Sequence, residues 1–364
     1  MPHYHQLTKN RLLAGFWYAK LYGLRFRKNA PMREQLKEQL IRPVELMAEN
    51  AMLRALDISE LMKHRDGFVL VPCPACEHEQ YKVKFEKSGF MFVSCNACET
   101  VYINPRPTNE MVIKFFTTAR SLKHWNDKIF PTSEESRRRD IFVPRANLVD
   151  KICEQNNVPK EALVDVGAGF GTFCQAVSEL KTFRKTVAIE PCHELAQSCR
   201  KRGIDTIELP IEQVESNQFN VITSFEVLYH SFAPKQFLLS CRRILMPGGL
   251  LILTTPNSKG FDLLVAGKSA DSLDGPNHMN SFNPYSLRLL LERCGFEVIE
   301  ITTPGKLDAQ IVRSLVLSGK LDISGCPFLK LVLIEEWERL GESFQDFLAD
   351  NELSGHMWAV AKKV

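Results

Sequence analysis

The stretch Leu163-Val-Asp-Val-Gly-Ala-Gly-Phe-Gly171 decides the fold of this chain. A short apolar run, typical of a buried strand, leads directly into three glycines at alternate positions, and a helical pattern follows. Glycine suits such a turn because it adopts backbone conformations closed to other residues and because bare main chain lets a ligand come close. The stretch therefore predicts a strand, a ligand-binding turn and a helix.

The spacing of the glycines narrows the kind of ligand. A dinucleotide-binding turn of the form G-x-G-x-x-G would need glycine at position 172, where this chain has Thr172. Here the third glycine is Gly171, and Asp165 stands two residues before the first. Glu190 ends the next predicted strand, where a carboxylate can accept both hydroxyls of an adenosine ribose. Dinucleotide binders share that acid, so it indicates an adenosine-containing ligand, with a solvated strand-end acid as the plain alternative.

Strands and helices alternate through the second half of the chain. The strands are expected at Leu163–Val166, Thr186–Ile189, Asp205–Glu208, Phe219–Ser224, Gly249–Thr254, Glu297–Ile301 and Met357–Ala361. The intervening helices are expected at Thr172–Leu180, His193–Arg202, Pro234–Leu245 and Pro284–Cys294. Such alternation predicts an α/β fold in which a doubly wound, mostly parallel sheet is covered by helices on both faces.

The remaining segments divide the chain into four parts. The predicted boundaries are 1–66 for a basic helical region, 67–108 for a cysteine module, 109–160 for a helical connector, and 161–364 for the α/β domain with a helical insertion at about 304–355. Pro43 should divide the first helical segment, and the insertion should carry a helix at Leu329–Leu348. No apolar run is long enough to span a membrane, and the Leu12–Ala19 run lacks the features of a secretory signal.

Two cysteine pairs, Cys73-Pro-Ala-Cys76 and Cys95-Asn-Ala-Cys98, are separated by 18 residues. That spacing is typical of a zinc site in which each pair supplies two thiolates to a tetrahedral ion. Four thiolates leave no open position, so we expect the zinc to be structural. Two independent redox motifs are the alternative, but neither pair opens a βαβ unit. The other seven of the eleven cysteines are scattered, which favours a reducing, cytoplasmic location.

Residues 1–33 form a basic and aromatic arm. They contain seven Lys or Arg, six aromatic residues and no Asp or Glu, in a chain whose formal net charge is only +3. Such an arm suits an anionic partner such as a membrane surface, a nucleic acid or a nucleotide-linked substrate. A first helix packed on its own domain, with its charges in water, is an equal alternative.

The segment Leu245-Met-Pro-Gly-Gly-Leu-Leu-Ile-Leu-Thr-Thr-Pro-Asn257 is a helix end, a turn and a fifth strand. Together with the glycine turn, the region from Asp165 to the closing strand resembles the class I S-adenosylmethionine-dependent methyltransferases. The resemblance implies a sheet of seven strands, with the last one antiparallel and inserted between the fifth and sixth. It also implies a set of S-adenosylmethionine-binding residues, which are Asp165, Gly167, Gly169 and Gly171 at the methionine and ribose, Glu190 at the ribose hydroxyls, and Ile211 and Glu212 near the adenine.

A cysteine ribbon, the exit segment Val101–Thr108 and a methyltransferase domain together resemble a more particular group. These bacterial enzymes belong to surface-polysaccharide or deoxysugar pathways and include sugar C-methyltransferases with an N-terminal zinc domain. The resemblance implies methyl transfer to a small-molecule acceptor, namely a nucleotide-linked or lipid-linked sugar, on carbon or oxygen.

Candidate catalytic residues follow the fourth and fifth predicted strands. Glu226, Tyr229 and His230 stand at the C-terminal edge of the sheet, where ligands of such folds bind. His230 is the favoured general base because an unperturbed imidazole titrates near neutral pH. His278, in the loop after the fifth strand, is either a base or a hydrogen-bonding residue that fastens the loop. Purely structural roles remain open for both histidines.

Two other functions compete with a sugar methyltransferase. An RNA methyltransferase could use the ribbon and the basic arm to grip nucleic acid. The near-neutral overall charge argues against nucleic acid, as does the lack of an Asn/Asp-Pro-Pro-Tyr motif after the fourth strand. The third possibility is a binding protein that retains the cofactor pocket without turnover. The sequence does not indicate an oligomeric state.

Overall fold

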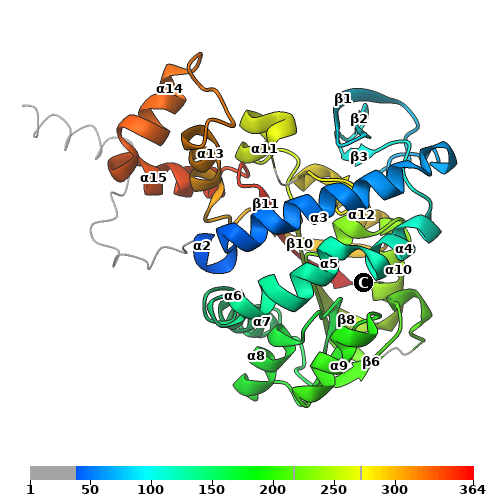
Figure 1. Ribbon diagram of the computed structural model, residues 1–364. Helices are drawn as coiled ribbons and strands as arrows, with labels where there is room; N and C mark the ends of the chain where they lie inside the picture. The colour runs from blue at the N-terminus through cyan, green and yellow to red at the C-terminus, as the bar shows by residue number, and fades with distance from the viewer. Residues whose placement is uncertain (1–37, 216–217, 271–272) are drawn as a thin grey trace, which may run out of the picture. The chain divides into compact units, whose positions relative to one another are not determined.

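A seven-stranded sheet lies at the centre of the computed structural model, which describes residues 38–215, 218–270 and 273–364 (Figure 1). The basic arm at 1–33 lies outside the described residues. The strands are β4 Ala162–Val166, β5 Lys185–Ile189, β6 Asp205–Ile207, β7 Phe219–Phe225, β8 Leu245–Pro256, β10 Phe296–Thr302 and β11 His356–Lys363. Their order is β10-β11-β8-β7-β4-β5-β6, and β11 is antiparallel to both of its neighbours. The predicted class I methyltransferase fold is confirmed.

Alternate residues of each central strand enter two different cores. Leu163 of β4 and Val221 of β7 pack in a cluster with α7 Val143–Gln155 and α8 Thr172–Leu180. Val164 and Ile222, the next residue of each strand, pack in a second cluster with α10 Pro234–Ile244 and α12 Pro284–Arg293. Because successive side chains of a strand point to opposite faces, apolar runs without alternation give a sheet buried on both sides. Helix α9, His193–Lys201, shares a smaller apolar cluster with α8.

The cysteine module is a second, antiparallel sheet that includes a strand from the α/β domain. Its strands are β1 Tyr81–Lys87, β2 Phe90–Cys95, β3 Val101–Ile103 and β9 Asn280–Ser281, in that order. Strand β9 comes from the loop after β8, so the module and the domain share one sheet. The chain from Lys37 onward is accordingly one unit. The predicted boundaries inside this unit stay a prediction.

Arg106 joins the cysteine module to two loops of the α/β domain. Its side chain is 1% exposed. Nη1 donates to the Phe232 carbonyl at 3.1 Å, Nη2 to Asn280 Oδ1 at 3.1 Å, and Nε to the Ile103 carbonyl at 3.2 Å. Asn280 Nδ2 in turn donates to the carbonyls of Tyr229 and Ser231, at 3.3 and 2.8 Å. The buried Arg106 guanidinium therefore holds both loops, which carry His230 and His278.

In the view of Figure 1, helices from the first part of the chain lie in front of the sheet. They are α2 Glu38–Ile41, α3 Val44–Met62, α4 Asn109–Thr118, α5 Arg120–His124 and α6 Phe130–Arg137, with π-helical turns at Trp125–Ile129 and Arg138–Phe142. The predicted division at Pro43 is confirmed, since α2 ends and α3 begins on either side of it. Figure 1 shows α3 running alongside α5, in agreement with their direct contacts.

The segment between β10 and β11 carries its own helices around a small apolar core. They are α13 Asp308–Leu317, α14 Pro327–Lys330 and α15 Trp337–Asp350; α11 Phe261–Ala266 packs against α13. The single helix predicted at Leu329–Leu348 is wrong, because a π-helical turn at Leu331–Glu335 and a non-helical Glu336 interrupt it. None of the described helices combines the length and apolar character that a bilayer span requires.

The Arg106→Leu variant should lose about 3 kcal/mol of unfolding free energy, because buried carbonyl and amide oxygens would lose a charged donor. Chemical denaturation of the full chain measures this loss. Arg184, which is 84% exposed and pairs with Glu161, is the matched control, and Arg184→Leu should change stability little. Equal stabilities for the two variants would contradict the role given to Arg106.

Candidate functional site

The glycine turn after β4 leaves one glycine facing open space. All three glycines have positive φ: 77° at Gly167, 55° at Gly169 and 76° at Gly171. A Cβ at Gly167 would lie 2.5 Å from Val227 Cγ2, and one at Gly171 would lie 2.9 Å from Cys199 Sγ. A Cβ at Gly169 would meet no atom within 4 Å. Packing therefore requires glycine at the two outer positions, while the middle one presents bare main chain to a ligand.

Glu190 lies beside this open position at the tip of β5. Its side chain is buried, and Oε2 accepts the Gly169 N–H at 2.8 Å while Oε1 accepts the Cys192 N–H at 2.9 Å. Burial raises the pKa of Glu190, and the two backbone hydrogen bonds oppose that rise. Each carboxylate oxygen keeps a further lone pair that can accept a ribose hydroxyl. The geometry fits the predicted role of Glu190 in holding an adenosine ribose.

Asp165 is buried at the end of β4 and connects this strand to β7. Its Oδ1 accepts a hydrogen bond from Thr223 Oγ1 at 2.7 Å. Burial raises the pKa of Asp165 to about 7, against the lowering effect of the Thr223 bond and the Arg145 charge. A cationic group of a ligand, such as the ammonium of S-adenosylmethionine, would favour the ionised carboxylate.

Helix α6 covers the glycine turn. The Phe130 ring stacks on that of Phe170 with centroids 4.0 Å apart. Thr172 Oγ1 donates to Glu134 Oε1 at 2.9 Å, and Arg202 pairs with the same carboxylate. The connector helix is thus fastened over the predicted cofactor position, a contact that the sequence did not indicate.

Glu226, directly after β7, is held by an arginine and a histidine. Its φ is 61°, and Oε1 accepts the Thr254 hydroxyl at 2.7 Å. Arg145 Nη2 and His356 Nδ1 lie 3.6 and 3.4 Å from the same oxygen. Burial opposes ionisation of Glu226, but His356 and Arg145 outweigh it, so its pKa is lowered. Glu226 is therefore a fixed anion and a poor general base at neutral pH.

Sequence reasoning missed Arg145 and His356. Arg145 belongs to the helix that leads into the domain, and no motif distinguishes it. His356 is the first residue of β11 and faces the end of β8, where it pairs with Pro256. The predicted insertion of the last strand beside the fifth could have placed His356 at this edge.

Tyr229, His230 and His278 form an aromatic cluster. The Tyr229 ring lies 4.0 Å from the His230 ring and stacks on the His278 ring at 4.9 Å. The ring of Phe116 from α4 lies edge-on to His230 at 5.4 Å. Two loops distant in sequence and one connector helix therefore meet around His230.

Both histidines of the cluster are neutral at physiological pH. Burial lowers the pKa of His230 to about 4 and that of His278 to about 3. His230 Nδ1 is hydrogen-bonded to the Asn277 carbonyl, and His278 Nδ1 lies 3.3 Å from the Asp274 carbonyl. Because Nδ1 must donate in both contacts, Nε2 of each ring is the nitrogen left to accept a proton.

The two predicted adenine-region residues lie apart from this cluster. The Ile211 side chain is buried in the core shared with α10, and Glu212 is exposed on the same short turn. Arg243 fixes the turn by donating to the carbonyls of both residues. Their predicted proximity to adenine stays a prediction.

The four cysteines of the ribbon converge. All four Sγ atoms lie within 4.8 Å of one another, and the Cys73–Cys98 and Cys76–Cys95 pairs are each 3.5 Å apart. Tetrahedral zinc with bonds of about 2.3 Å would separate its sulfurs by roughly 3.8 Å. The cluster fits a metal ion, and Asn283 Nδ2 donates to the Cys98 carbonyl at 3.0 Å, which connects it to the start of α12.

Residues 135–301 match the model of a methyltransferase domain family. Two curated relatives are ubiquinone biosynthesis O-methyltransferases. That of Maricaulis maris is 29% identical over 136 residues, or 32% of this chain and 52% of the relative. That of Saccharophagus degradans is 25% identical over 175 residues, or 44% and 73%. The chain thus spans about half the length of the first relative.

Two solved structures with a similar arrangement are described as S-adenosylmethionine-dependent methyltransferases. That of Clostridium acetobutylicum has a TM-score of 0.43 and 11% identity, covering 65% of this chain and 98% of the other. That of Archaeoglobus fulgidus has a TM-score of 0.40 and 16% identity, covering 60% and 94%. The family match and the sheet order agree with the predicted enzyme class, an S-adenosylmethionine-dependent methyltransferase.

The Asp165→Asn variant should change how stability depends on pH. A carboxyl group with a folded pKa of about 7 binds a proton more tightly in the native state than in the unfolded chain, so its contribution to stability is lost as pH rises from about 4 to 7. The variant lacks this loss and should gain up to about 4 kcal/mol on the wild type between pH 4 and 8. Denaturant titrations of both proteins at these two pH values measure the gain; parallel curves would refute the raised pKa.

Proposed function

We propose that this protein transfers a methyl group from S-adenosylmethionine to a small-molecule acceptor. The observation that carries the proposal is the open main chain at Gly169, with the Glu190 carboxylate hydrogen-bonded to its N–H. A carboxylate fixed there can accept ribose hydroxyls, and the methyltransferase domain match covers this turn.

The chain's own residues would position the acceptor and take its proton. The cofactor supplies an electrophilic methyl group on a sulfonium, and displacement is in line, so placement of the nucleophile provides much of the rate. His230 Nε2 would accept the proton as the new bond to methyl forms and the carbon–sulfur bond breaks. Its pKa of about 4 removes the neutral-pH titration for which the sequence favoured it, so its position among Tyr229, His278 and Phe116 supports the assignment instead. The neutral Tyr229 phenol, whose pKa burial raises, can donate a hydrogen bond to the acceptor. The Glu226 carboxylate supplies negative charge near the same edge of the sheet.

The acceptor is proposed to be a sugar, either nucleotide-linked or lipid-linked. The combination of a cysteine ribbon with this domain supports that choice, as do the polar groups around the histidines. The two curated relatives described above are ubiquinone biosynthesis O-methyltransferases, so an aromatic hydroxyl is the acceptor class to be distinguished from a sugar. Mass spectrometry of the small molecules that co-purify with the full chain can detect an acceptor of either class.

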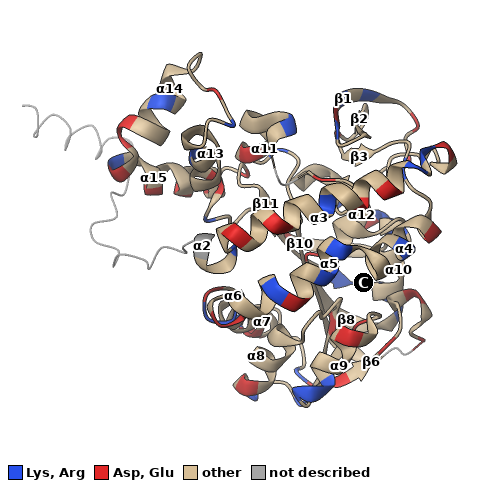
Figure 2. Ribbon diagram, in the orientation of Figure 1, with Lys and Arg blue, Asp and Glu red and all other residues tan. Residues whose placement is uncertain are grey.

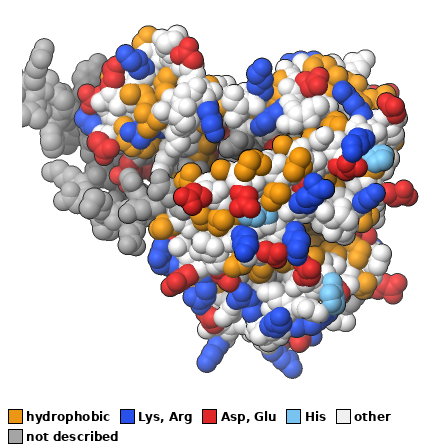
Figure 3. All heavy atoms as spheres, in the orientation of Figure 1, with side chains coloured by type: hydrophobic (Ala, Val, Ile, Leu, Met, Phe, Trp, Pro, Cys, Tyr) orange, Lys and Arg blue, Asp and Glu red, His pale blue; other side chains and the backbone are white. Residues whose placement is uncertain are grey.

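The cysteine cluster is proposed to hold a structural zinc ion, with all four thiolates as ligands. The eleven cysteines are all free of disulfides, which supports a reducing cytoplasmic location. On the drawn face of the described residues, Lys and Arg alternate with Asp and Glu (Figures 2 and 3). This mixture favours a small acceptor over an extended nucleic acid. The basic arm at 1–33 remains a candidate contact for an anionic membrane surface.

The Glu190→Ala variant should bind S-adenosylhomocysteine about tenfold more weakly, because it removes charge-assisted hydrogen bonds to the ribose. Isothermal titration calorimetry on the full chain measures the change. Glu161→Ala, at an exposed acid before β4, is the control and should leave the affinity unchanged. Unaltered affinity in Glu190→Ala would count against the proposed cofactor position.

Elemental analysis should find one zinc ion per chain, and Cys98→Ser should reduce that content. Because β9 and Asn283 connect the ribbon to the α/β domain, removal of zinc with a chelator should lower the thermal midpoint of the whole protein. A metal-free preparation with an unchanged midpoint would exclude a structural role for the metal.

A further inference from the structure

Large apolar side chains are exposed together on the helical segment between β10 and β11. Phe328 of α14 is 60% exposed and Phe347 of α15 52%, and Leu331, three residues after Phe328 in the same helical run, is 40% exposed. The ring of Phe344 joins the two exposed rings, since its centroid lies 6.2 Å from that of Phe328 and 6.4 Å from that of Phe347. Single exposed apolar residues are ordinary, but a cluster of them indicates a contact surface.

A row of carboxylates runs along α15 beside these rings. Its four members are exposed and stand at intervals of four residues, which places them along one side of the helix: Glu338, Glu342, Asp346 and Asp350. Asp346 directly precedes Phe347, so the row adjoins the exposed rings. This carboxylate row, together with Phe328 and Phe347, is called the α15 surface below.

The carboxylate row is unfavourable for the protein by itself. Like charges four residues apart on a helix repel one another, and negative charge in the last turn opposes the helix dipole. The last turn of α15 contains no basic residue, although it carries Asp350. In the described part of the chain no ion pair involves the four carboxylates. The cations of α14 and α15, Lys330 and Arg339, pair instead with Glu335 and Glu336.

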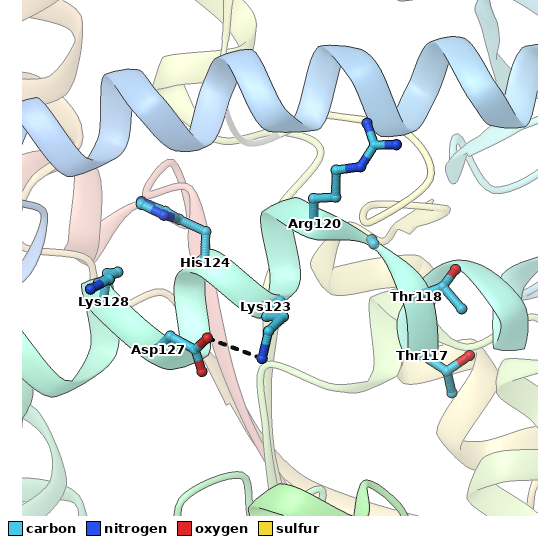
Figure 4. Close-up of a pocket in the computed structure, with 8 residues that line it drawn as sticks. Thr117, Thr118, Arg120, Lys123, His124, Asp127 and Lys128 are labelled. Atoms are coloured by element: carbon cyan, nitrogen blue, oxygen red, sulfur yellow. Dashed lines mark ion pairs between the residues drawn. The ribbon is translucent and has the colours of Figure 1, made fainter.

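On α5 and α12, by contrast, exposed acids have a cation at helical spacing. Asp127 lies 3.1 Å from Lys123, and Figure 4 shows these two side chains directed toward each other beside the pocket that α5 lines. Glu292 lies 3.9 Å from Arg288 in the same way. The row on α15 departs from this pattern, which indicates counter-charges supplied by a partner.

The charge of the whole insertion agrees with this indication. Residues 304–355 contain five Lys or Arg and nine Asp or Glu, which gives a net charge of −4, whereas the full chain has +3. A local field of this sign attracts basic molecules and increases their rate of association. The insertion therefore differs from the rest of the chain in the partners that it favours.

Charge and apolar rings together select one kind of occupant. A second copy bound through the same surface would bring two carboxylate rows face to face, because a twofold contact uses the same patch on both subunits. Phosphates of a nucleic acid or of an anionic membrane would meet the same repulsion. A basic amphipathic helix matches both features, since its cations can face the row while its apolar side chains cover the rings.

Helix α15 is also connected to the edge of the candidate site. Gln345 Nε2 donates to Asp308 Oδ2 at 2.7 Å, and Asp308 Oδ1 accepts the Gly355 N–H at 2.7 Å. The next residue is His356, which lies beside Glu226. A partner bound on α15 would thus be attached to the helix that fixes the start of β11.

We propose that the α15 surface binds a basic amphipathic helix of a partner protein. The rings of Phe328 and Phe347 pack against the apolar face of that helix, and its lysines or arginines pair with the carboxylate row. The inference gives the insertion a role in holding a partner next to the methyltransferase domain. It does not depend on methyl transfer, so it can fail without affecting the proposed function.

Fluorescence anisotropy with the full chain and labelled peptides tests this surface. The probe is an amphipathic peptide of leucine and lysine of about 14 residues, or roughly four helical turns. One comparison peptide has glutamate in place of every lysine, and another has the same composition in an order that removes the apolar face. The protein should bind the amphipathic lysine peptide in preference to both.

Asp346→Lys and Phe347→Ser should each weaken binding of the lysine peptide about tenfold, because one reverses a charge of the row and the other removes an exposed ring. Asp346→Lys also relieves repulsion in the free protein, so it should not lower the thermal midpoint. The matched controls are Glu135→Lys on α6 and Ile113→Ser on α4, at an exposed acid and an exposed apolar residue elsewhere. Both should bind like the wild type.

Equal binding of the glutamate peptide or of the rearranged peptide would overturn the inference, as would wild-type affinity in Asp346→Lys and Phe347→Ser. Sedimentation velocity tests a second copy as the occupant, and flotation with phosphatidylglycerol vesicles tests a membrane. A dimer that Phe347→Ser converts to monomer, or vesicle binding that this variant abolishes, would assign the surface to one of those occupants and would equally overturn the inference.

Discussion

Parallel pairing of β4 with both β5 and β7 is the constraint on which the site depends. Since parallel strands end at the same edge, it brings Asp165, Glu190 and Glu226 to one side of the sheet, although 61 positions separate the first from the last. Their environments then separate their roles. Burial raises the pKa of Asp165, backbone N–H groups hold Glu190, and Arg145 and His356 lower the pKa of Glu226.

The cysteine ribbon contacts loops of the α/β domain that lie away from its four cysteines. Strand β3 pairs with β9, and Arg106 reaches the loops that carry His230 and His278. The same loops supply Asn277 and the stacked Tyr229. A metal held by the four thiolates would therefore stabilise the walls of the acceptor region without contacting them.

Much of the fold can be predicted from local sequence. Buried parallel strands appear as continuous apolar runs, and the glycine turn fixes a strand before it and a helix after it. The start and end of α8 were predicted to the residue. Helix α15 was not, since Glu336 leaves the helical conformation only in the context of the small core around Leu333 and Leu348. Local propensity contains no information about such tertiary packing.

The same reasoning explains which parts of the site the sequence revealed. Motif residues such as Glu190 and His230 follow strand ends, where position alone indicates a role. Arg145 and His356 acquire their surroundings only when distant segments meet. Arg145 is the clearest case, because a lone arginine in a helix predicts nothing until its contact with Glu226 is known.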